Sequence, residues 1–238
     1  MRFSLVIPCY NESKSIPALI ERCKILIDHG HFEVVLVDNG SSDNTHDIIQ
    51  TENPCGDALR CVRLTPNRGY GGGILAGLEA CRGDVIGWSH ADLQTDPVDA
   101  ISAAALFLRS QNPENLFVKG TRYGRPLVDR FFTAGMGVLE TMLIGHAMHD
   151  INAQPTLFHR NFFRAWSQPP SDFSLDLYAY AMAKHHGLSV ARFPVLFAPR
   201  QHGHSHWNRS MGDRLKFIKR TLTYSFGMPR RLRGNTCG

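Results

Sequence analysis

The chain has 238 residues, and its 26 lysines and arginines against 21 aspartates and glutamates give a formal net charge of +5. With 43% hydrophobic and 20% charged residues it has the composition of a globular protein, which excludes a disordered or collagen-like chain. A domain of this length can bury a large core without disulfides or a structural metal. The modest positive charge does not indicate a nucleic-acid partner, so we expect none.

Neither the N-terminal segment nor the cysteine spacing indicates secretion. The apolar stretch that ends at Ile7 runs directly into a proline and is too short for a secretory signal. The weakly charged stretch Phe131–His149 is interrupted by Glu140 and His146, so it falls short of the ~20 apolar residues that span a bilayer. The six cysteines include no C-x-x-C pair, which predicts free thiols in a reducing compartment. We therefore expect a cytoplasmic protein.

Short β-branched segments alternate with helical patterns over the first half of the chain. The expected strands are Phe3–Ile7, Glu33–Val37, Arg60–Leu64, Asp84–Trp88 and Asn115–Val118. The expected helices are Ser15–Ile27, one whose start signal is Ser42 or Asp43, one that starts within the run Asn67–Gly73, and one capped by Asp96 with Pro97 at its first position. Repeated strand–helix–strand units predict an α/β fold with a mostly parallel central sheet flanked by helices.

The alternation fades after about residue 120. We expect a long helical stretch, an irregular segment over Asp150–Arg160, a helix near Leu175–Gly187 and a strand over Ser189–Val195. No linker is evident, so residues 1–207 are predicted to form one domain. Residues 208–238 form a basic amphipathic tail, which can lie on an anionic membrane surface or pack its apolar side on the protein's own core.

Polar loops follow three of the predicted strands. They read PCYNE over residues 8–12, VDNGSSD over 37–43 and SHADLQ over 89–94. Because ligands of parallel sheets bind outside the carboxyl ends of the strands, we expect these loops to converge on one cleft. Asp38 can accept hydrogen bonds from a base or ribose, and the backbone amides from Gly40 to Asp43 suit the polar parts of a nucleotide.

The glycine run Asn67–Gly73 resembles a dinucleotide loop only weakly. Gly71, Gly73 and Ala76 fit G-x-G-x-x-A, but the run follows the third strand and no phosphate-loop motif accompanies it. We interpret the glycines as residues that allow the start of a helix to pack tightly against the sheet and a nucleotide.

A divalent metal site is predicted after the fourth strand. Asp92 and Gln94 can offer oxygen ligands to a cation that bridges two phosphates. His90 precedes them in the same phase, and an imidazole suits Mn²⁺ better than Mg²⁺. His90, Asp92 and Gln94 are therefore the candidate ligands of Mg²⁺ or Mn²⁺, with capping of the next turn as the alternative role of Asp92.

In its order of motifs the chain resembles the glycosyltransferase family 2 enzymes of the glycosyltransferase A fold, and among them the dolichyl- or polyprenyl-phosphate mannosyl- and glucosyltransferases. The similar segments are VIPCYNE (6–12), VDNGSSDNT (37–45), the stretch from Asn67 to Pro97 and KGTR (119–122), then more loosely 150–160, 173–195 and the pattern of Arg200, Gly203 and Ser205. The resemblance implies that a hexose moves with inversion from a UDP- or GDP-sugar to polyprenyl phosphate at the cytosolic membrane face. Residues 1–120 would then bind the nucleotide sugar, and residues 121–207 the acceptor.

The resemblance also implies site residues by matching position. The nucleotide-sugar group is Pro8, Tyr10, Glu12, Asp38, Gly40, Asn67, Gly71 and Asp92, and the phosphate group is Arg122, Arg130, Arg200 and Ser205. Asp92 and Arg122 would take part in catalysis. Asp150 and Asp176 are the available bases for a hydroxyl acceptor, or they orient arginines, whereas an anionic lipid phosphate needs no base.

Two departures from the family pattern leave alternatives open. His90 stands where the family usually has an aspartate, and His206 stands where a lysine often follows the Arg200 pattern. Transfer to a sugar hydroxyl in surface-polysaccharide or glycolipid synthesis, and nucleotide-sugar binding without catalysis, are the alternative functions. A metal site at His202, His204 and His206 is less consistent with this pattern than a phosphate-facing loop, and a homo-oligomer stays open.

Overall fold

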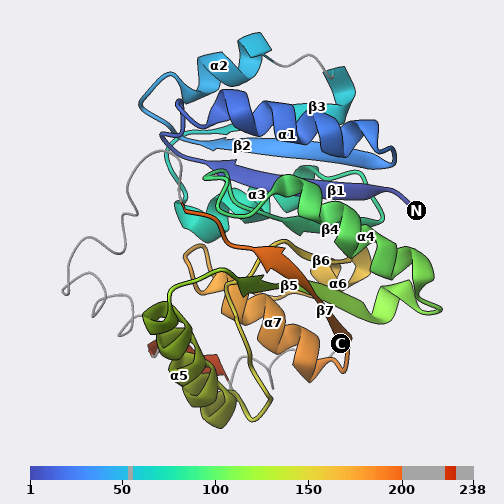
Figure 1. The fold of residues 1–238 in the computed structure, drawn as a ribbon, viewed down its shortest axis with the longest axis vertical. Coiled ribbons are helices and arrows are strands. Elements are labelled where there is room, and N and C mark those ends of the chain that lie inside the picture. Colours follow the sequence, from blue (N-terminus) through green and yellow to red (C-terminus); the bar gives the residue numbers. More distant parts are fainter. Residues whose placement is uncertain (53–55, 200–222, 229–238) are drawn as a thin grey trace.

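A computed structural model describes residues 1–52, 56–199 and 223–228 of the chain, and only the backbone of residues 127–130 and 132. The strands are β1 (Phe3–Cys9), β2 (Phe32–Asn39), β3 (Leu59–Leu64), β4 (Val85–Trp88), β5 (Leu116–Tyr123), β6 (Thr156–His159) and β7 (Ser189–Leu196). The α-helices are α1 (Ile16–Asp28), α2 (Thr45–Glu52), α3 (Gly69–Ala80), α4 (Ala100–Arg109), α5 (Leu127–Ile144), α6 (Arg160–Arg164) and α7 (Leu175–His185) (Figure 1). Short 3₁₀ turns lie at Gly56–Ala58, Pro97–Asp99 and Pro113–Asn115.

The strands form one seven-stranded sheet in the order β3-β2-β1-β4-β6-β5-β7. β6 is antiparallel to β4 and β5, and the other pairs are parallel. Strands buried on both faces explain the nearly continuous apolar runs of β1 and β2. The mostly parallel α/β sheet predicted from the sequence is therefore confirmed.

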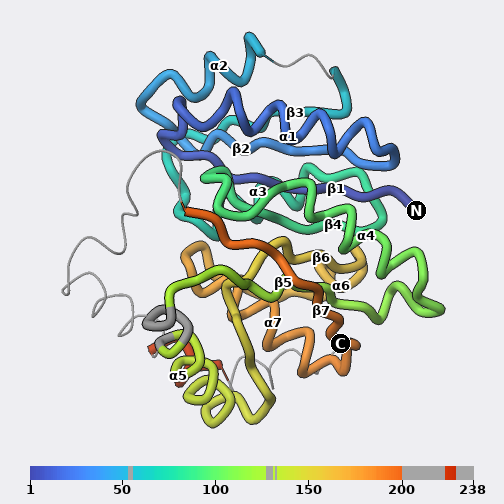
Figure 2. Tube along the Cα trace, viewed as in Figure 1, coloured from blue at the N-terminus to red at the C-terminus, as the bar shows by residue number. Residues whose placement is uncertain are grey.

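Helices cover both faces of the sheet and produce two apolar cores. One core joins alternate residues of β1 and β2 to α1 and α4, through side chains such as Leu19 and Phe107. The other joins the opposite faces of these strands to α3 and α7, through side chains such as Ile74 and Tyr178. In Figure 2 the first strands, in blue and cyan, make up the β3 side of the sheet, and α5 and α7 lie toward its other side.

Two details differ from the sequence prediction. β6 lies inside Asp150–Arg160, which we expected to be irregular. α2 begins at Thr45, and Asp43, one of the two expected start signals, caps it, since its Oδ1 accepts from the Thr45 amide at 3.0 Å. The 3₁₀ turn that Asp96 caps, by accepting from the Val98 amide at 2.9 Å, precedes α4. Residue 120, where the nucleotide-sugar-binding half is expected to end, lies inside β5, and this division into two halves of one domain stays a prediction.

Candidate functional site

The loops after β1 and β2 are hydrogen-bonded to each other at the carboxyl edge of the sheet. The Asn11 amide donates to Ser41 Oγ at 3.0 Å, and the Ser42 amide donates to Asn11 Oδ1 at 2.8 Å. The Glu12 amide donates to Thr45 Oγ1 at 2.9 Å. The loop after β4 begins beside them, because the Ser89 amide donates to the carbonyl of Val6 in β1 at 2.9 Å. The three loops thus lie at one end of the sheet, and the cleft expected between them stays a prediction.

Asp38, the penultimate residue of β2, presents a buried carboxylate at this edge. Its Oδ1 accepts from the Ser41 amide at 3.0 Å, whereas its buried Oδ2 has no hydrogen-bond partner in the structure. His46 Nδ1 and Arg63 Nε lie 3.5 and 3.6 Å from Oδ2, at ion-pair range. A buried acceptor without a hydrogen bond is costly, so Oδ2 is suited to accept an N–H group from a ligand such as a base. Sequence reasoning missed His46 and Arg63.

The other residues expected near the nucleoside have mixed surroundings. Pro8 lies in β1 opposite Val37, and Tyr10 is exposed directly after that strand. The Glu12 carboxylate accepts from Ser15 Oγ at 3.1 Å and so helps to start α1. The nucleotide-binding roles of these three residues stay predictions.

Gly40, directly after β2, packs against Asn67, which lies in the turn between β3 and α3. Asn67 Oδ1 accepts from the Gly69 amide at 2.7 Å. Gly40 has φ +73°, and a Cβ there would lie 2.7 Å from the Asn67 nitrogen, so this close approach requires glycine. Asn39 fixes the same turn, because its side chain donates to the Gly69 carbonyl at 2.8 Å and accepts from the Arg68 amide at 3.0 Å.

Gly71 packs against the loop 170–172 in the second half of the chain. A Cβ on Gly71 would lie 2.5 Å from the carbonyl oxygen of Pro170 and 2.7 Å from that of Asp172. The neighbouring Gly72 amide donates to the Ser171 carbonyl at 2.9 Å. The structure therefore shows close chain packing at this helix start, and a contact between Gly71 and a nucleotide stays a prediction.

Replacement of Gly71 by alanine should lower the free energy of unfolding by about 1–3 kcal/mol, because the new methyl group meets backbone atoms rather than a movable side chain. Gly135 in α5 is the matched control, since a Cβ there meets nothing within 4 Å and alanine favours a helix. Urea unfolding of Gly71→Ala and Gly135→Ala measures both changes. Equal stability of the two variants would contradict the packing described here.

The predicted metal ligands lie in the loop that follows β4. Asp92 is buried, and its Oδ1 accepts from the Gln94 amide at 3.1 Å, so it also caps the turn. Gln94 holds the segment after β7, since its Nε2 donates to the Ala198 carbonyl at 3.3 Å. The His90 ring lies 5.8 Å from the Tyr70 ring, centroid to centroid.

Asp92 and Gln94 fit a divalent cation whose other ligands are phosphate oxygens and water. Within residues 1–52, 56–199 and 223–228, no group of three or more His, Cys, Asp or Glu side chains could hold a metal ion. One carboxylate and one amide oxygen nevertheless suit Mg²⁺ or Mn²⁺ when phosphate oxygens and water complete the shell. Asp92 and Gln94 are the residues that would hold such a cation, with the imidazole of His90 nearby.

A pair of arginines gathers around Asp150 near the carboxyl end of β5. Arg122 donates to Asp150 from its amide and from Nε, both at 2.9 Å, and also from Nη2. Arg125 Nη1 lies 3.8 Å from the same carboxylate. Both guanidinium groups lie over the ring of Phe197, at 5.3 and 5.6 Å. Burial raises the pKa of Asp150, but hydrogen bonds and charge from Arg122 outweigh this and hold it below its ordinary value.

Asp150 therefore orients an arginine, as one of the two sequence-based alternatives proposed. Arg125 and Phe197 were missed, although Arg125 lies only three residues beyond the KGTR segment. Arg130 lies in α5, where its side chain is not described, and Arg200 and Ser205 lie outside the described residues. The histidines 202, 204 and 206 also lie outside them.

Asp176 lies in a buried polar network behind the loop after β4. It accepts hydrogen bonds from Tyr70 Oη at 3.0 Å, from Trp88 Nε1 at 3.3 Å and from Gln154 Nε2 at 3.4 Å. Lys119 Nζ lies 4.0 Å away and donates to Thr156 Oγ1 at 2.7 Å. Burial lowers the pKa of Lys119 to about 7, although Asp176 acts to raise it. Among the residues that the structure describes, the charged neighbour of Asp176 is this lysine rather than an arginine.

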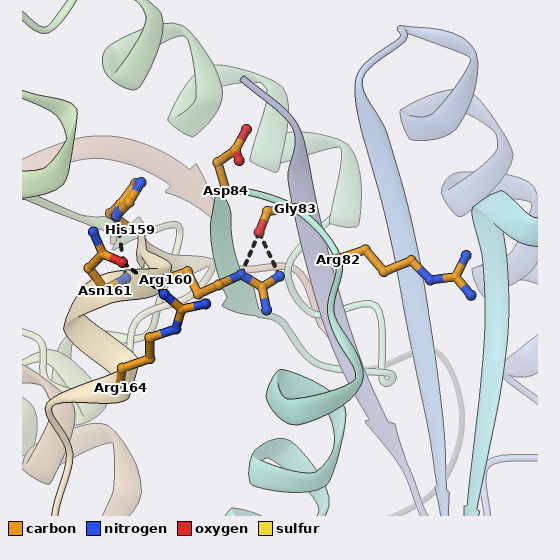
Figure 3. A pocket seen from close by; sticks show the side chains of 7 residues that line it. All are labelled: Arg82, Gly83, Asp84, His159, Arg160, Asn161 and Arg164. Atoms are coloured by element: carbon orange, nitrogen blue, oxygen red, sulfur yellow. Dashed lines mark hydrogen bonds between the residues drawn. The ribbon is translucent and has the colours of Figure 1, made fainter.

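A pocket of about 490 Å³ lies at the other end of the strands, where β4 begins and β6 ends (Figure 3). Arg160 points into it and donates to the carbonyls of Gly83 and Cys81, at distances from 2.6 to 2.9 Å. In Figure 3 the side chain of Arg82 points away from this group. The arginine thus holds a chain turn together, and the pocket is separate from the strand-end loops described above.

Comparison with known proteins identifies a protein family whose members include sugar transferases. The sequence profile described as "Glycosyl transferase family 2" matches residues 4–166. An undecaprenyl-phosphate 4-deoxy-4-formamido-L-arabinose transferase of Serratia proteamaculans is 32% identical over 178 residues, which cover 68% of this chain and 54% of that protein. The protein of the same description from Pseudomonas syringae is 44% identical over 98 residues, covering 40% of this chain and 29% of that protein. The chain spans about half or less of the length of these relatives.

A solved structure shares the fold. Glucosyl-3-phosphoglycerate synthase from Mycobacterium tuberculosis, in complex with Mn²⁺, UDP and glucosyl-3-phosphoglycerate, matches with a TM-score of 0.71 and 18% sequence identity. The match covers 96% of this chain and 81% of that protein. None of the helices in the described part of this chain is long and apolar enough to cross a membrane.

Proposed function

This chain belongs to glycosyl transferase family 2, and from that premise we propose that it transfers a sugar with inversion from a UDP- or GDP-sugar to a polyprenyl phosphate at the cytosolic face of a membrane. The undecaprenyl-phosphate sugar transferases among its relatives support the acceptor class. The donor class is supported by the UDP complex of the structural neighbour and by the unsatisfied Oδ2 of Asp38.

One observation carries the choice of acceptor. Both candidate bases already interact with other side chains of the protein, so neither is available to remove a proton from a hydroxyl group. Asp150 is paired with Arg122 and Arg125, and its lowered pKa makes it a weak base. Asp176 is buried under the hydrogen bonds of Tyr70 and its neighbours. A hydroxyl acceptor needs a base to remove its proton, whereas a phosphate is already an anionic nucleophile. Two guanidinium groups beside one carboxylate leave a positive site for that phosphate.

The donor side of the proposal follows from the loops after β2 and β4. Asp38 would accept a hydrogen bond from the base, and Asp92 with Gln94 would hold the divalent cation on the diphosphate. When bound, the cation stabilises the negative charge that develops on the departing diphosphate. The arginine pair would hold the acceptor phosphate and align its oxygen with the sugar.

The direct test incubates the purified chain with UDP- and GDP-sugars, Mg²⁺ or Mn²⁺, and undecaprenyl phosphate in detergent micelles. We expect one donor to yield a glycolipid that thin-layer chromatography and mass spectrometry identify. Calorimetric binding of a donor without turnover on any acceptor would instead support a nucleotide-sugar-binding protein. Transfer to a sugar hydroxyl but not to the lipid phosphate would overturn the acceptor assignment.

Replacement of Asp150 by asparagine should raise the KM for the acceptor phosphate roughly tenfold, because Arg122 and Arg125 lose the charge that orients them. The kcat should fall by much less than the ~10²–10⁴-fold loss expected when a catalytic base is removed. Initial rates at varied acceptor and donor concentrations separate the two effects. Asp150→Glu, which keeps a carboxylate, should restore part of the acceptor affinity, and a kcat loss without a KM change would show that Asp150 is a base.

A further inference from the structure

His46, in the first turn of α2, faces the carboxylate of Asp38 at the carboxyl end of β2. Its Nδ1 atom lies 3.5 Å from Asp38 Oδ2. Within the described part of the chain, both atoms are buried and neither has a hydrogen-bond partner. Because nearly all buried polar atoms of folded proteins are hydrogen-bonded, two such atoms side by side indicate a functional site.

The register of the sheet fixes where the Asp38 side chain points. Asp38 in β2 pairs with Cys9 in β1 and with Arg63 in β3, so the three side chains lie on the same face of the sheet. Cys9 packs in the core on this face, as does Ile49 of α2. His46 reaches the carboxylate from the same helix. The fully buried Asp38 side chain is therefore enclosed by two strands and a helix.

These neighbours differ in how they can support a negative charge. Burial raises the pKa of the Cys9 thiol, which donates to the Ile7 carbonyl at 3.5 Å and so stays a neutral group. Arg63 Nε lies 3.6 Å from Asp38 Oδ2, but the arginine side chain is 56% exposed and makes no hydrogen bond to this oxygen. The His46 side chain is only 20% exposed. The imidazole is thus the fixed support, and the exposed arginine can move aside to uncover Oδ2.

An imidazole at this distance supports Oδ2 without using up its capacity to accept. Histidine can present an N–H from Nδ1 in its neutral and in its protonated form. At 3.5 Å and without hydrogen-bond geometry, this N–H attracts the oxygen but leaves its lone pairs open. Oδ1 already accepts from the Ser41 amide at 3.0 Å. Oδ2 is therefore the oxygen that can accept an N–H from a uracil or guanine ring.

We propose that His46 is a positioning residue of the donor site, which holds the Asp38 carboxylate in the orientation that accepts the N–H group of the nucleotide base. This inference rests on the proposed function, because it takes the carboxyl end of β2 as the place of the donor base. A base lies far from the reacting bond and keeps its contacts during transfer. Loss of His46 therefore weakens donor binding and leaves the chemical step unchanged.

The test is calorimetric titration of the full chain with UDP and with GDP in the presence of Mg²⁺. His46→Leu, which has no N–H group, should weaken binding of the preferred nucleotide roughly tenfold, because the carboxylate loses its fixed support. His46→Asn keeps an amide N–H close to the place of Nδ1 and should recover most of the affinity. A purely structural role of the ring would give no such recovery.

His29→Leu is the matched control, because it makes the same substitution at an exposed histidine directly after α1. This histidine lies at the other end of the strands, since the nearby His31 carbonyl accepts from the Phe3 amide at the start of β1, at 2.8 Å. The control should bind the nucleotide like the wild type. In the glycolipid assay, His46→Leu should raise the KM for the donor by a similar factor, with kcat and the KM for the acceptor unchanged.

Nucleotide binding does not require turnover, so this inference and the proposed function can fail separately. A chain that binds UDP or GDP in the expected pattern but makes no glycolipid would contradict the proposed function alone. Urea unfolding of the His46 variants shows whether they keep the fold. The inference is overturned if His46→Leu binds the nucleotide like the wild type, if His46→Asn binds as weakly as His46→Leu, or if the wild type binds neither nucleotide.

Discussion

Asp92→Asn is expected to lower kcat for sugar transfer roughly 10²–10³-fold while leaving the fold intact. Asp92 supplies the carboxylate of the expected cation site, next to the amide of Gln94, and asparagine keeps the shape but loses the charge. The apparent affinity for Mn²⁺ in the presence of UDP should fall as well. Rates over a Mn²⁺ titration, and Mn²⁺ binding followed by electron paramagnetic resonance, measure the two effects separately.

Asp84→Asn is the matched control for this prediction. Asp84 directly precedes β4 and is exposed at the other end of the strand, where its carboxylate accepts from the Arg2 amide at 2.8 Å. It should keep full activity and full Mn²⁺ affinity. If Asp92→Asn is as active as Asp84→Asn, the loop after β4 is not the cation site.

Much of the fold follows from local pattern. β1 and β2 are apolar runs because both of their faces are buried, and turn residues mark where the helices begin. The convergence of the loops after β1, β2 and β4 follows from the rule that parallel strands present their carboxyl ends at one edge. β6 was missed because its four residues, directly before α6, have too few positions to show a strand period.

The partners of the site residues depend on long-range packing, which local pattern does not encode. Tyr70 and Trp88 meet Asp176 across 106 and 88 residues of chain, and nothing near Asp176 in the sequence announces these donors. Phe197 follows an ordinary strand, yet it supports two arginines from another strand end. The residue types of the candidate site could therefore be proposed from the sequence. The interactions of Asp150 with Arg122 and of Asp176 with Tyr70 and Trp88 could not.

The buried interactions of Asp176 predict a large loss of stability when its pair with Lys119 is broken. Asp176→Leu removes the counter-charge that favours the ammonium form of Lys119, so the lysine must give up its proton or stay charged without a partner, and it also removes the acceptor of Tyr70 and Trp88. Removing one partner of a buried pair costs about 3–5 kcal/mol, a large part of the roughly 5–15 kcal/mol that stabilises a domain. Urea unfolding at pH 7 measures the change, and a loss below ~1 kcal/mol would show that the pair is unimportant.

The double variant Lys119→Met/Asp176→Leu distinguishes charge from packing. It removes both charges, so it should be more stable than Asp176→Leu alone, although Tyr70 and Trp88 still lack their acceptor.

The dependence of stability on pH is a second test of the buried lysine. The pKa of Lys119 is about 7 in the folded chain, against an ordinary value of 10.5, so between these values the unfolded chain holds a proton that the folded chain has released. Stability from this group therefore rises with pH above about 7, and below it both states hold the proton and the difference is constant. The stability of the wild type relative to Lys119→Met should thus increase from pH 7 to pH 9, and a decrease over this range would contradict a buried lysine that loses its charge on folding.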